Sequence, residues 1–167
     1  GEGSNYSRVY QRSIRMDSKL ILAVAGSGKT RYLIESLSLE ERSLIVTYTI
    51  NNIENLRKRV IQKFGFMPEN IRIYTYFSFL YQFCFQPLYQ DASKAKGISF
   101  TNPPFKDRRK KTAVTHYFVP SLRILYANRL AKFFLEFDTD GLNSVKQRLE
   151  RYFDNLFVDE FQDFASY

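Results

Sequence analysis

A glycine-rich stretch between an apolar run and a helical pattern constrains this chain more than any other feature. Residues 20–24 are apolar, residues 23–30 read AVAGSGKT, and Leu33, Ile34 and Leu37 follow at helical spacing. Glycines let backbone N–H groups approach a phosphate, and the amino end of a helix adds partial positive charge. The sequence therefore predicts a strand, a phosphate-binding loop and a helix.

Each polar residue of this loop has an expected contact. Lys29 would reach the β- and γ-phosphates of a nucleotide, and the Thr30 hydroxyl would bind Mg²⁺. Ala23 occupies the first position, where the general pattern has Gly. A glycine-rich turn with an exposed lysine is the structural alternative. The remaining phosphate contacts are expected from Ala25, Gly26, Ser27 and Gly28.

A second signal, FVDEFQD, occupies residues 157–163 and reads as an apolar strand that ends in acids. In a phosphate-loop fold, a carboxylate at the tip of a neighbouring strand can hold Mg²⁺, and the next one can activate water. Asp159 is the candidate metal ligand and Glu160 the candidate general base. Taken alone, the same acids are equally typical of a solvated strand end.

Strand patterns at residues 20–24, 44–48, 71–75 and 156–158 alternate with helical patterns at 29–39, 52–64 and 77–85. This alternation predicts a parallel sheet with helices on both faces. The pattern weakens over residues 86–120, where we expect an insertion without sheet elements. Residues 122–137 predict a long amphipathic helix, and residues 142–152 predict a further helix.

Composition narrows the class of protein. The chain has 25 Lys and Arg against 17 Asp and Glu, a net charge of +8, which favours a polyanionic partner. One cysteine and one histidine exclude an internal disulfide and a zinc site built from Cys and His alone. No apolar run is long enough to cross a bilayer. We expect a cytoplasmic protein with no membrane partner.

Four motifs resemble those of UvrD/Rep-like superfamily 1 DNA helicases. AVAGSGKT resembles motif I of the family, in which Ala is usual at the first position, and DEFQD at 159–163 is similar to motif II. Residues 47–60 resemble motif Ia, although Ile53 and Glu54 replace two alanines. Residues 75–79 resemble motif Ib, with Phe77 where the family has His. The four blocks occur in the order and spacing of the family.

The resemblance implies a RecA-like P-loop NTPase fold with three α/β layers and a parallel sheet. It implies an ATP-binding domain (1A) at residues 19–85 and 152–167, and a mainly helical inserted subdomain (1B-like) at 86–151, after an N-terminal segment, 1–18. The implied activity is that of an ATP-dependent DNA helicase with ATP and Mg²⁺ as cofactors. By resemblance, Gln162 takes the role of the motif II glutamine, which couples the γ-phosphate to DNA movement in the family. Arg31 would lie beside the adenine, and Gln11 would read the adenine edge.

The expected partner is single-stranded or partly duplex DNA, with the single strand held by the segments that resemble motifs Ia and Ib. Hydroxyl and backbone N–H groups at strand ends can hold phosphates, and aromatic rings can stack on bases. The basic run at 106–111 could meet phosphates too, or form a solvated loop. We expect His116 and Cys84 to be structural. The positions assigned to DNA are Tyr48, Thr49, Asn51, Thr75, Tyr76 and Ser78.

The chain ends shortly after the block that resembles motif II, so the family's second RecA-like domain, with its catalytic arginines, has no counterpart. We expect that domain of the same polypeptide as a partner and little ATPase activity without it. Two alternatives stay open. One is a non-helicase P-loop nucleotide kinase, with residues 86–120 as a lid, or another NTPase, and the other is a binding module that no longer hydrolyses nucleotide.

Overall fold

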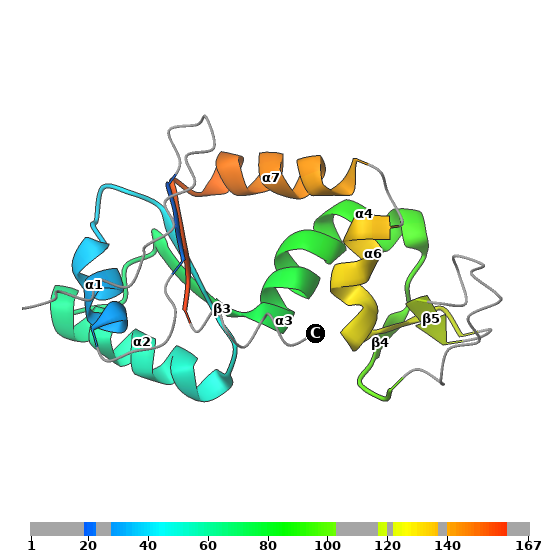
Figure 1. The fold of residues 1–167 in the computed structure, drawn as a ribbon, viewed down its shortest axis with the longest axis horizontal. Coiled ribbons are helices and arrows are strands. Elements are labelled where there is room, and N and C mark those ends of the chain that lie inside the picture. The colour runs from blue at the N-terminus through cyan, green and yellow to red at the C-terminus, as the bar shows by residue number, and fades with distance from the viewer. Residues whose placement is uncertain (1–18, 23–27, 103–116, 120–121, 137–139, 160–167) are drawn as a thin grey trace, which may run out of the picture. The chain divides into compact units, whose positions relative to one another are not determined.

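The computed structural model describes residues 19–22, 28–102, 117–119, 122–136 and 140–159. The chain divides into two compact units (Figure 1). Residues 1–76 and 150–167 form the first unit, and residues 77–149 form the second unit. Among the described residues, no helix combines the length and the apolar character that a membrane span requires.

A parallel sheet organises the first unit. Its strands lie in the order β1-β7-β2-β3, and every neighbouring pair is parallel. The carboxyl ends of all these strands therefore lie at one edge of the sheet, and the alternation in the sequence predicted this correctly. The strands are β1 (Lys19–Leu22), β2 (Ser43–Thr47), β3 (Ile71–Thr75) and β7 (Asn155–Val158).

Two helices, α1 (Lys29–Ser36) and α2 (Ile50–Phe64), pack against each other and against this sheet (Figure 1). Leu56 and Val60 are buried on one face of α2, the helix predicted at residues 52–64. Burying such side chains contributes about 1.5–3 kcal/mol each, which makes this core the main support of the unit. Its buried members are Leu33, Ile34, Leu37, Ile45, Leu56, Val60, Ile71 and Phe157.

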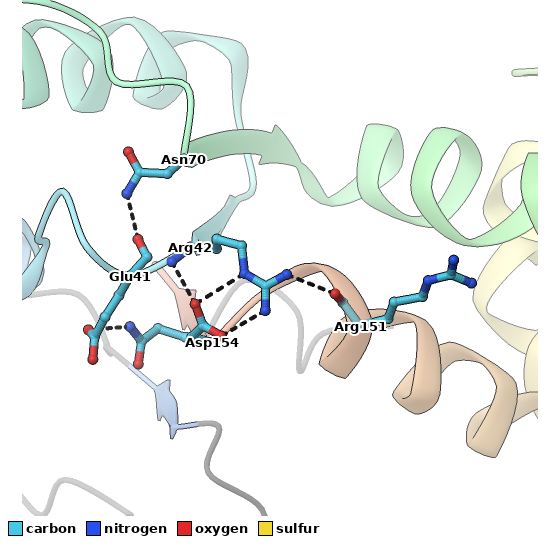
Figure 2. Close-up of polar contacts among 6 residues, drawn as sticks. Glu41, Arg42, Asn70, Arg151 and Asp154 are labelled. Carbon is cyan, nitrogen blue, oxygen red and sulfur yellow. Dashed lines mark hydrogen bonds and ion pairs between the residues drawn. The ribbon is translucent and has the colours of Figure 1, made fainter.

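An ion pair joins the amino ends of β2 and β7 (Figure 2). Arg42, directly before β2, donates from Nη2 to Asp154 Oδ1 at 2.8 Å and from Nε to Oδ2 at 3.2 Å. The backbone N–H of Arg42 also donates to Asp154 Oδ2 at 2.8 Å, and Arg42 Nη1 donates to the carbonyl of Arg151 at 2.9 Å. Side-chain and backbone hydrogen bonds thus join the start of β2 to the start of β7.

Two asparagine side chains extend this network at the same edge. Asn70, directly before β3, donates from Nδ2 to the carbonyl of Glu41 at 2.6 Å, and Asn155 Nδ2 donates to Glu41 Oε2 at 2.8 Å. Ser43 is accordingly level with both Asn155 and Ile71 in the ladder. Because the amino ends of these strands are held level, their carboxyl ends are level as well.

The second unit has a core of aromatic rings. Phe133 is fully buried, and its ring meets those of Phe85, Tyr89, Tyr117 and Phe118 edge-on at centroid distances of 5.4–6.4 Å. Its described helical segments are α3 (Tyr76–Ser78), which begins in the first unit, the π-helix η1 (Phe79–Phe85), α4 (Gln86–Ser93), the 3-10 turn η2 (Ala127–Arg129), α6 (Leu130–Glu136) and α7 (Gly141–Tyr152), which ends in the first unit.

A small mixed sheet in the second unit corrects two predictions. β4 (Gly97–Ser99) pairs in parallel with β6 (Ile124–Tyr126), and β5 (Phe118–Val119) pairs with β6 antiparallel. Residues 86–120 therefore do contain sheet elements. The helix predicted over 122–137 begins only at Leu130, because Arg123 has a left-handed backbone, with φ of 52°, and the buried residues after it form a strand.

Candidate functional site

The carboxyl edge of the parallel sheet brings three of its polar residues side by side. The backbone N–H of Asp159 donates to the carbonyl of Val46 at 2.9 Å, which continues the β7–β2 ladder one residue beyond β7. Val158 is level with Val46, so Asp159 lies beside Thr47, and Thr47 is level with Thr75. In open α/β sheets, ligands bind outside this edge.

Strand alternation directs these side chains toward the helices. Asp159 follows Phe157 by two residues and Thr47 follows Ile45 by two, and both apolar residues belong to the core beneath α1 and α2. Asp159 is only 6% exposed, and Thr47 Oγ1 is buried without a hydrogen-bond partner among the described residues. Asp159 has interactions within the structure, so the Thr47 hydroxyl beside it, unpartnered within the described ranges and at the edge where ligands bind, makes this corner a candidate ligand site.

The helix α1 begins a few residues after the end of β1, the strand that lies next to β7 in the sheet. Leu22, the last residue of β1, is level with Val158, and residues 23–27 connect β1 to α1 outside the described part of the chain. Gly28 is the N-cap of α1, and its lack of a side chain leaves the amide groups of the first turn without a side-chain cap. Lys29 and Thr30, both half-buried, form that first turn.

The polar groups at this corner suit a nucleotide with bound Mg²⁺. The Thr30 hydroxyl and the Asp159 carboxylate are hard oxygen ligands of the type that Mg²⁺ prefers. Lys29 and the amides of the first turn of α1 suit a phosphate. Within the described ranges, no group of three His, Cys, Asp or Glu side chains occurs that could hold a metal ion.

Arg31, predicted to lie beside the adenine, already has a partner. Its Nε contacts Glu35 Oε1 at 2.7 Å, one helical turn further along α1. The hydrogen bond and the charge of Glu35 raise the pKa of the Arg31 guanidinium. A base that stacks on Arg31 would thus contact a guanidinium that is already paired with Glu35 at the surface.

The residues assigned to DNA in the first unit gather after β2 and β3. Thr49 Oγ1 accepts the backbone N–H of Asn52 at 3.3 Å and so caps α2, which gives this hydroxyl a structural task. Asn51 is exposed in the first turn of α2, and Tyr48 is half-buried just before it. Thr75 and Tyr76 lie at the end of the neighbouring strand. Ser78 belongs to the second unit.

Other predicted residues lie outside the described part of the chain. They are Gln11, Ala25, Gly26, Ser27, Glu160, Gln162, the basic run 106–111 and His116. The described part of the site therefore comprises the first turn of α1, Asp159 and the segments after β2 and β3.

Two residues with roles in the first unit were not predicted. Lys63 Nζ donates to the carbonyls of Ile34, Glu35 and Leu37 at 2.9, 2.8 and 2.6 Å, which fixes the carboxyl end of α1 against α2. Thr47, the buried threonine beside Asp159, was placed in a motif without a role of its own. A lysine at the end of an amphipathic helix gives no sequence signal for carbonyl contacts so distant along the chain.

Comparisons of the chain with protein-family models, with curated proteins and with solved structures found no match.

Proposed function

We propose that this chain is the ATP- and single-strand-binding part of an ATP-dependent DNA helicase or translocase that resembles the UvrD/Rep-like superfamily. On this proposal the first unit is a RecA-like P-loop domain. One observation carries it: Asp159 is buried at the carboxyl end of β7, next to β1, the strand whose chain leads into Gly28, Lys29 and Thr30. A phosphate-binding helix end and a metal carboxylate on neighbouring strands are what a magnesium nucleotide site needs.

Each described residue has a defined task in this proposal. Thr30 and Asp159 would hold Mg²⁺, and Lys29 would neutralise phosphate charge beside the amides of α1. When bound, Mg²⁺ offsets the negative charge of the β- and γ-phosphates. Glu160 as the base and Gln162 as the coupling residue rest on the resemblance alone, since both lie outside the described residues.

The segments after β2 and β3 support the DNA part of the proposal. Thr47 and Thr75 are level, so the two segments leave the sheet next to each other. They offer an exposed amide at Asn51 and aromatic rings at Tyr48 and Tyr76. Such groups can contact the phosphates and bases of a single strand.

Nucleotide binding by the 167-residue chain tests the proposal directly. We expect a fluorescent ATP analogue to bind in the presence of Mg²⁺ and to bind about tenfold or more weakly to Lys29→Ala, because a phosphate loses its ammonium partner. Lys58→Ala is the matched control, since Lys58 is an exposed lysine on α2. Equal affinities of the Lys29→Ala and Lys58→Ala chains would contradict the proposal.

The DNA partner requires a separate measurement. We expect fluorescence anisotropy to show binding of a single-stranded oligonucleotide, and we expect Mg²⁺-ATP to change that affinity. Transfer of phosphate to a small acceptor without any binding of DNA would instead favour a nucleotide kinase and overturn the helicase proposal.

A further inference from the structure

The positive charge of the chain is concentrated in the second unit. Residues 77–149 contain twelve Lys and Arg against five Asp and Glu, a net charge of +7 out of the +8 of the whole chain. The described residues of this unit alone have seven basic against three acidic side chains. The first unit, which holds the candidate nucleotide site, is therefore almost neutral. A polyanion is attracted mainly by the second unit.

A column of aromatic rings leads from the core of this unit to its surface. Phe85 is fully buried, with its ring 5.5 Å from that of Phe133. The Tyr81 ring stacks on Phe85 at 6.0 Å, and the Phe77 ring stacks on Tyr81 at 5.8 Å, each pair within 18° of parallel. The Phe100 ring lies 5.1 Å from Phe77.

Phe100 is the exposed end of this column. It is 75% exposed, the largest exposure among the exposed large apolar side chains of the described residues, while Phe77 and Tyr81 are half-buried. The ring is therefore backed by stacked rings that a buried core holds in place. An aromatic ring that is supported from below and open above can accept another flat ring at little cost in side-chain entropy.

Polar residues flank Phe100 along the chain, and an exposed lysine lies at the other end of the short strand before it. Ser99 and Thr101 precede and follow Phe100, and their hydroxyl oxygens, Oγ and Oγ1, lie 2.7 Å apart. Ser99 is half-buried and Thr101 is exposed. Lys96 is exposed directly before β4, and Phe100 directly follows β4, about 13 Å further at the rise of a strand. A few nucleotides span such a distance.

We infer that Phe100, supported by Phe77 and Tyr81, is a base-stacking platform for single-stranded nucleic acid in the second unit. Stacking on aromatic rings combined with positive charge is how proteins bind single strands without reading their sequence. The net charge of +7 favours a polyanionic partner, and nucleic acid is the polyanion whose flat bases can also stack on an exposed ring. This inference goes beyond the proposed function, because it requires no nucleotide and none of the residues assigned to DNA in the first unit.

The test uses the 167-residue chain, without nucleotide and with EDTA, and fluorescein-labelled dT20. We expect Phe100→Ala to weaken binding about fivefold or more at every salt concentration, because one base loses its stacking partner. The slope of log affinity against log salt should stay unchanged, since no phosphate contact is removed. A 20-base-pair duplex, whose bases are already stacked, should bind both chains equally. The same series with rU20 tells RNA from DNA as the source of the strand.

Two further variants separate stacking from a general effect of the substitution. Phe100→Trp should restore the affinity for dT20, because it keeps a flat ring at this place. Phe66→Ala is the matched control, since Phe66 is a phenylalanine of the first unit that is 54% exposed. It should bind dT20 as the unchanged chain does.

Specific outcomes would overturn the inference. Unchanged dT20 affinity of Phe100→Ala would do so, and so would an equal loss for the duplex. A change in sedimentation or self-association on Phe100→Ala, with dT20 affinity intact, would make this surface a protein contact. Because nucleotide is absent, a failure of ATP binding leaves this result untouched, and the two proposals can fail separately.

Discussion

Arg42 and Asp154, 112 residues apart in the sequence, form an ion pair with Nη2 and Oδ1 at 2.8 Å, and the backbone N–H of Arg42 donates to the same carboxylate. The pair ties the start of β2 to the start of β7. The position of Asp159, at the far end of β7, depends on this register. A contact at the amino edge of the sheet thereby supports the candidate site at the carboxyl edge.

The Arg42–Asp154 pair predicts a dependence of stability on pH. Hydrogen bonds from the Arg42 side chain and backbone lower the pKa of Asp154 below its ordinary value of 3.8. The pair therefore stabilises the fold above that value and loses its contribution as pH falls below it through the lower folded pKa. We expect Asp154→Asn to lower the free energy of unfolding at about pH 6, and we expect the difference from the unchanged chain to shrink at about pH 3.

Urea unfolding at both pH values measures this difference. Glu40→Gln, at an exposed position two residues before Arg42, is the control for loss of one carboxylate. If Asp154→Asn destabilises the chain equally at both pH values, the ionised pair is not the cause.

The candidate metal ligand predicts different effects on Mg²⁺-dependent binding and on stability. Asp159→Asn keeps the shape of the buried side chain and removes its charge. We expect the affinity for the fluorescent ATP analogue to lose most of its Mg²⁺ dependence, because one hard oxygen ligand is weakened. We expect the melting temperature without Mg²⁺ to stay close to that of the unchanged chain, because asparagine keeps the volume of the side chain and can still form hydrogen bonds. Titrations with Mg²⁺ and with EDTA, together with thermal unfolding, test both. A variant with full Mg²⁺ dependence would remove Asp159 from the metal site.

Periodicity predicted the first unit well because its elements are defined locally. β1 and β2 are short apolar runs, each followed along the chain by a helix, and the buried pair Leu56 and Val60 orients α2. The level arrangement of Asp159, Thr47 and Thr75 is harder to see, because it depends on Arg42 meeting a residue 112 positions away. Glycines and acids can be found in the sequence, but the register that aligns them cannot.

The second unit was predicted less well for a physical reason that Arg123 illustrates. Its left-handed backbone ends any helix there, although no glycine marks the position. Leu125 and Tyr126, two and three residues later, are both buried and pair with β4, which lies more than twenty residues earlier. A helical spacing of apolar residues around 122–137 therefore coexists with a strand. Pairing between distant segments determined the structure where local spacing favoured a helix.

Substitution of Thr49 should destabilise the fold, in addition to any effect on DNA binding. Its hydroxyl caps α2 by accepting the Asn52 N–H. We expect Thr49→Ala to lower the free energy of unfolding by about 1 kcal/mol, and we expect Thr49→Ser to retain most of the stability because serine is an equally good cap. Urea unfolding measures both. If the two variants are equally stable, the cap contributes nothing, and any loss of DNA affinity in Thr49→Ala then reports on contact with DNA.

The thiol of Cys84 should react slowly in the folded chain, so its reaction rate measures how often the second unit unfolds locally. The side chain is fully buried, and this burial raises the pKa of the thiol to about 12. Because the thiolate is the reactive form, the folded chain should react with a disulfide reagent at neutral pH far more slowly than the urea-unfolded chain. The chain has one cysteine, so absorbance of the released thiolate follows this residue alone. A Cys84→Ser chain carrying Asn143→Cys, at an exposed position on α7, provides the fast control. Equal rates for Cys84 and for this control would show that the aromatic core around Phe85 and Phe133 does not exclude the reagent.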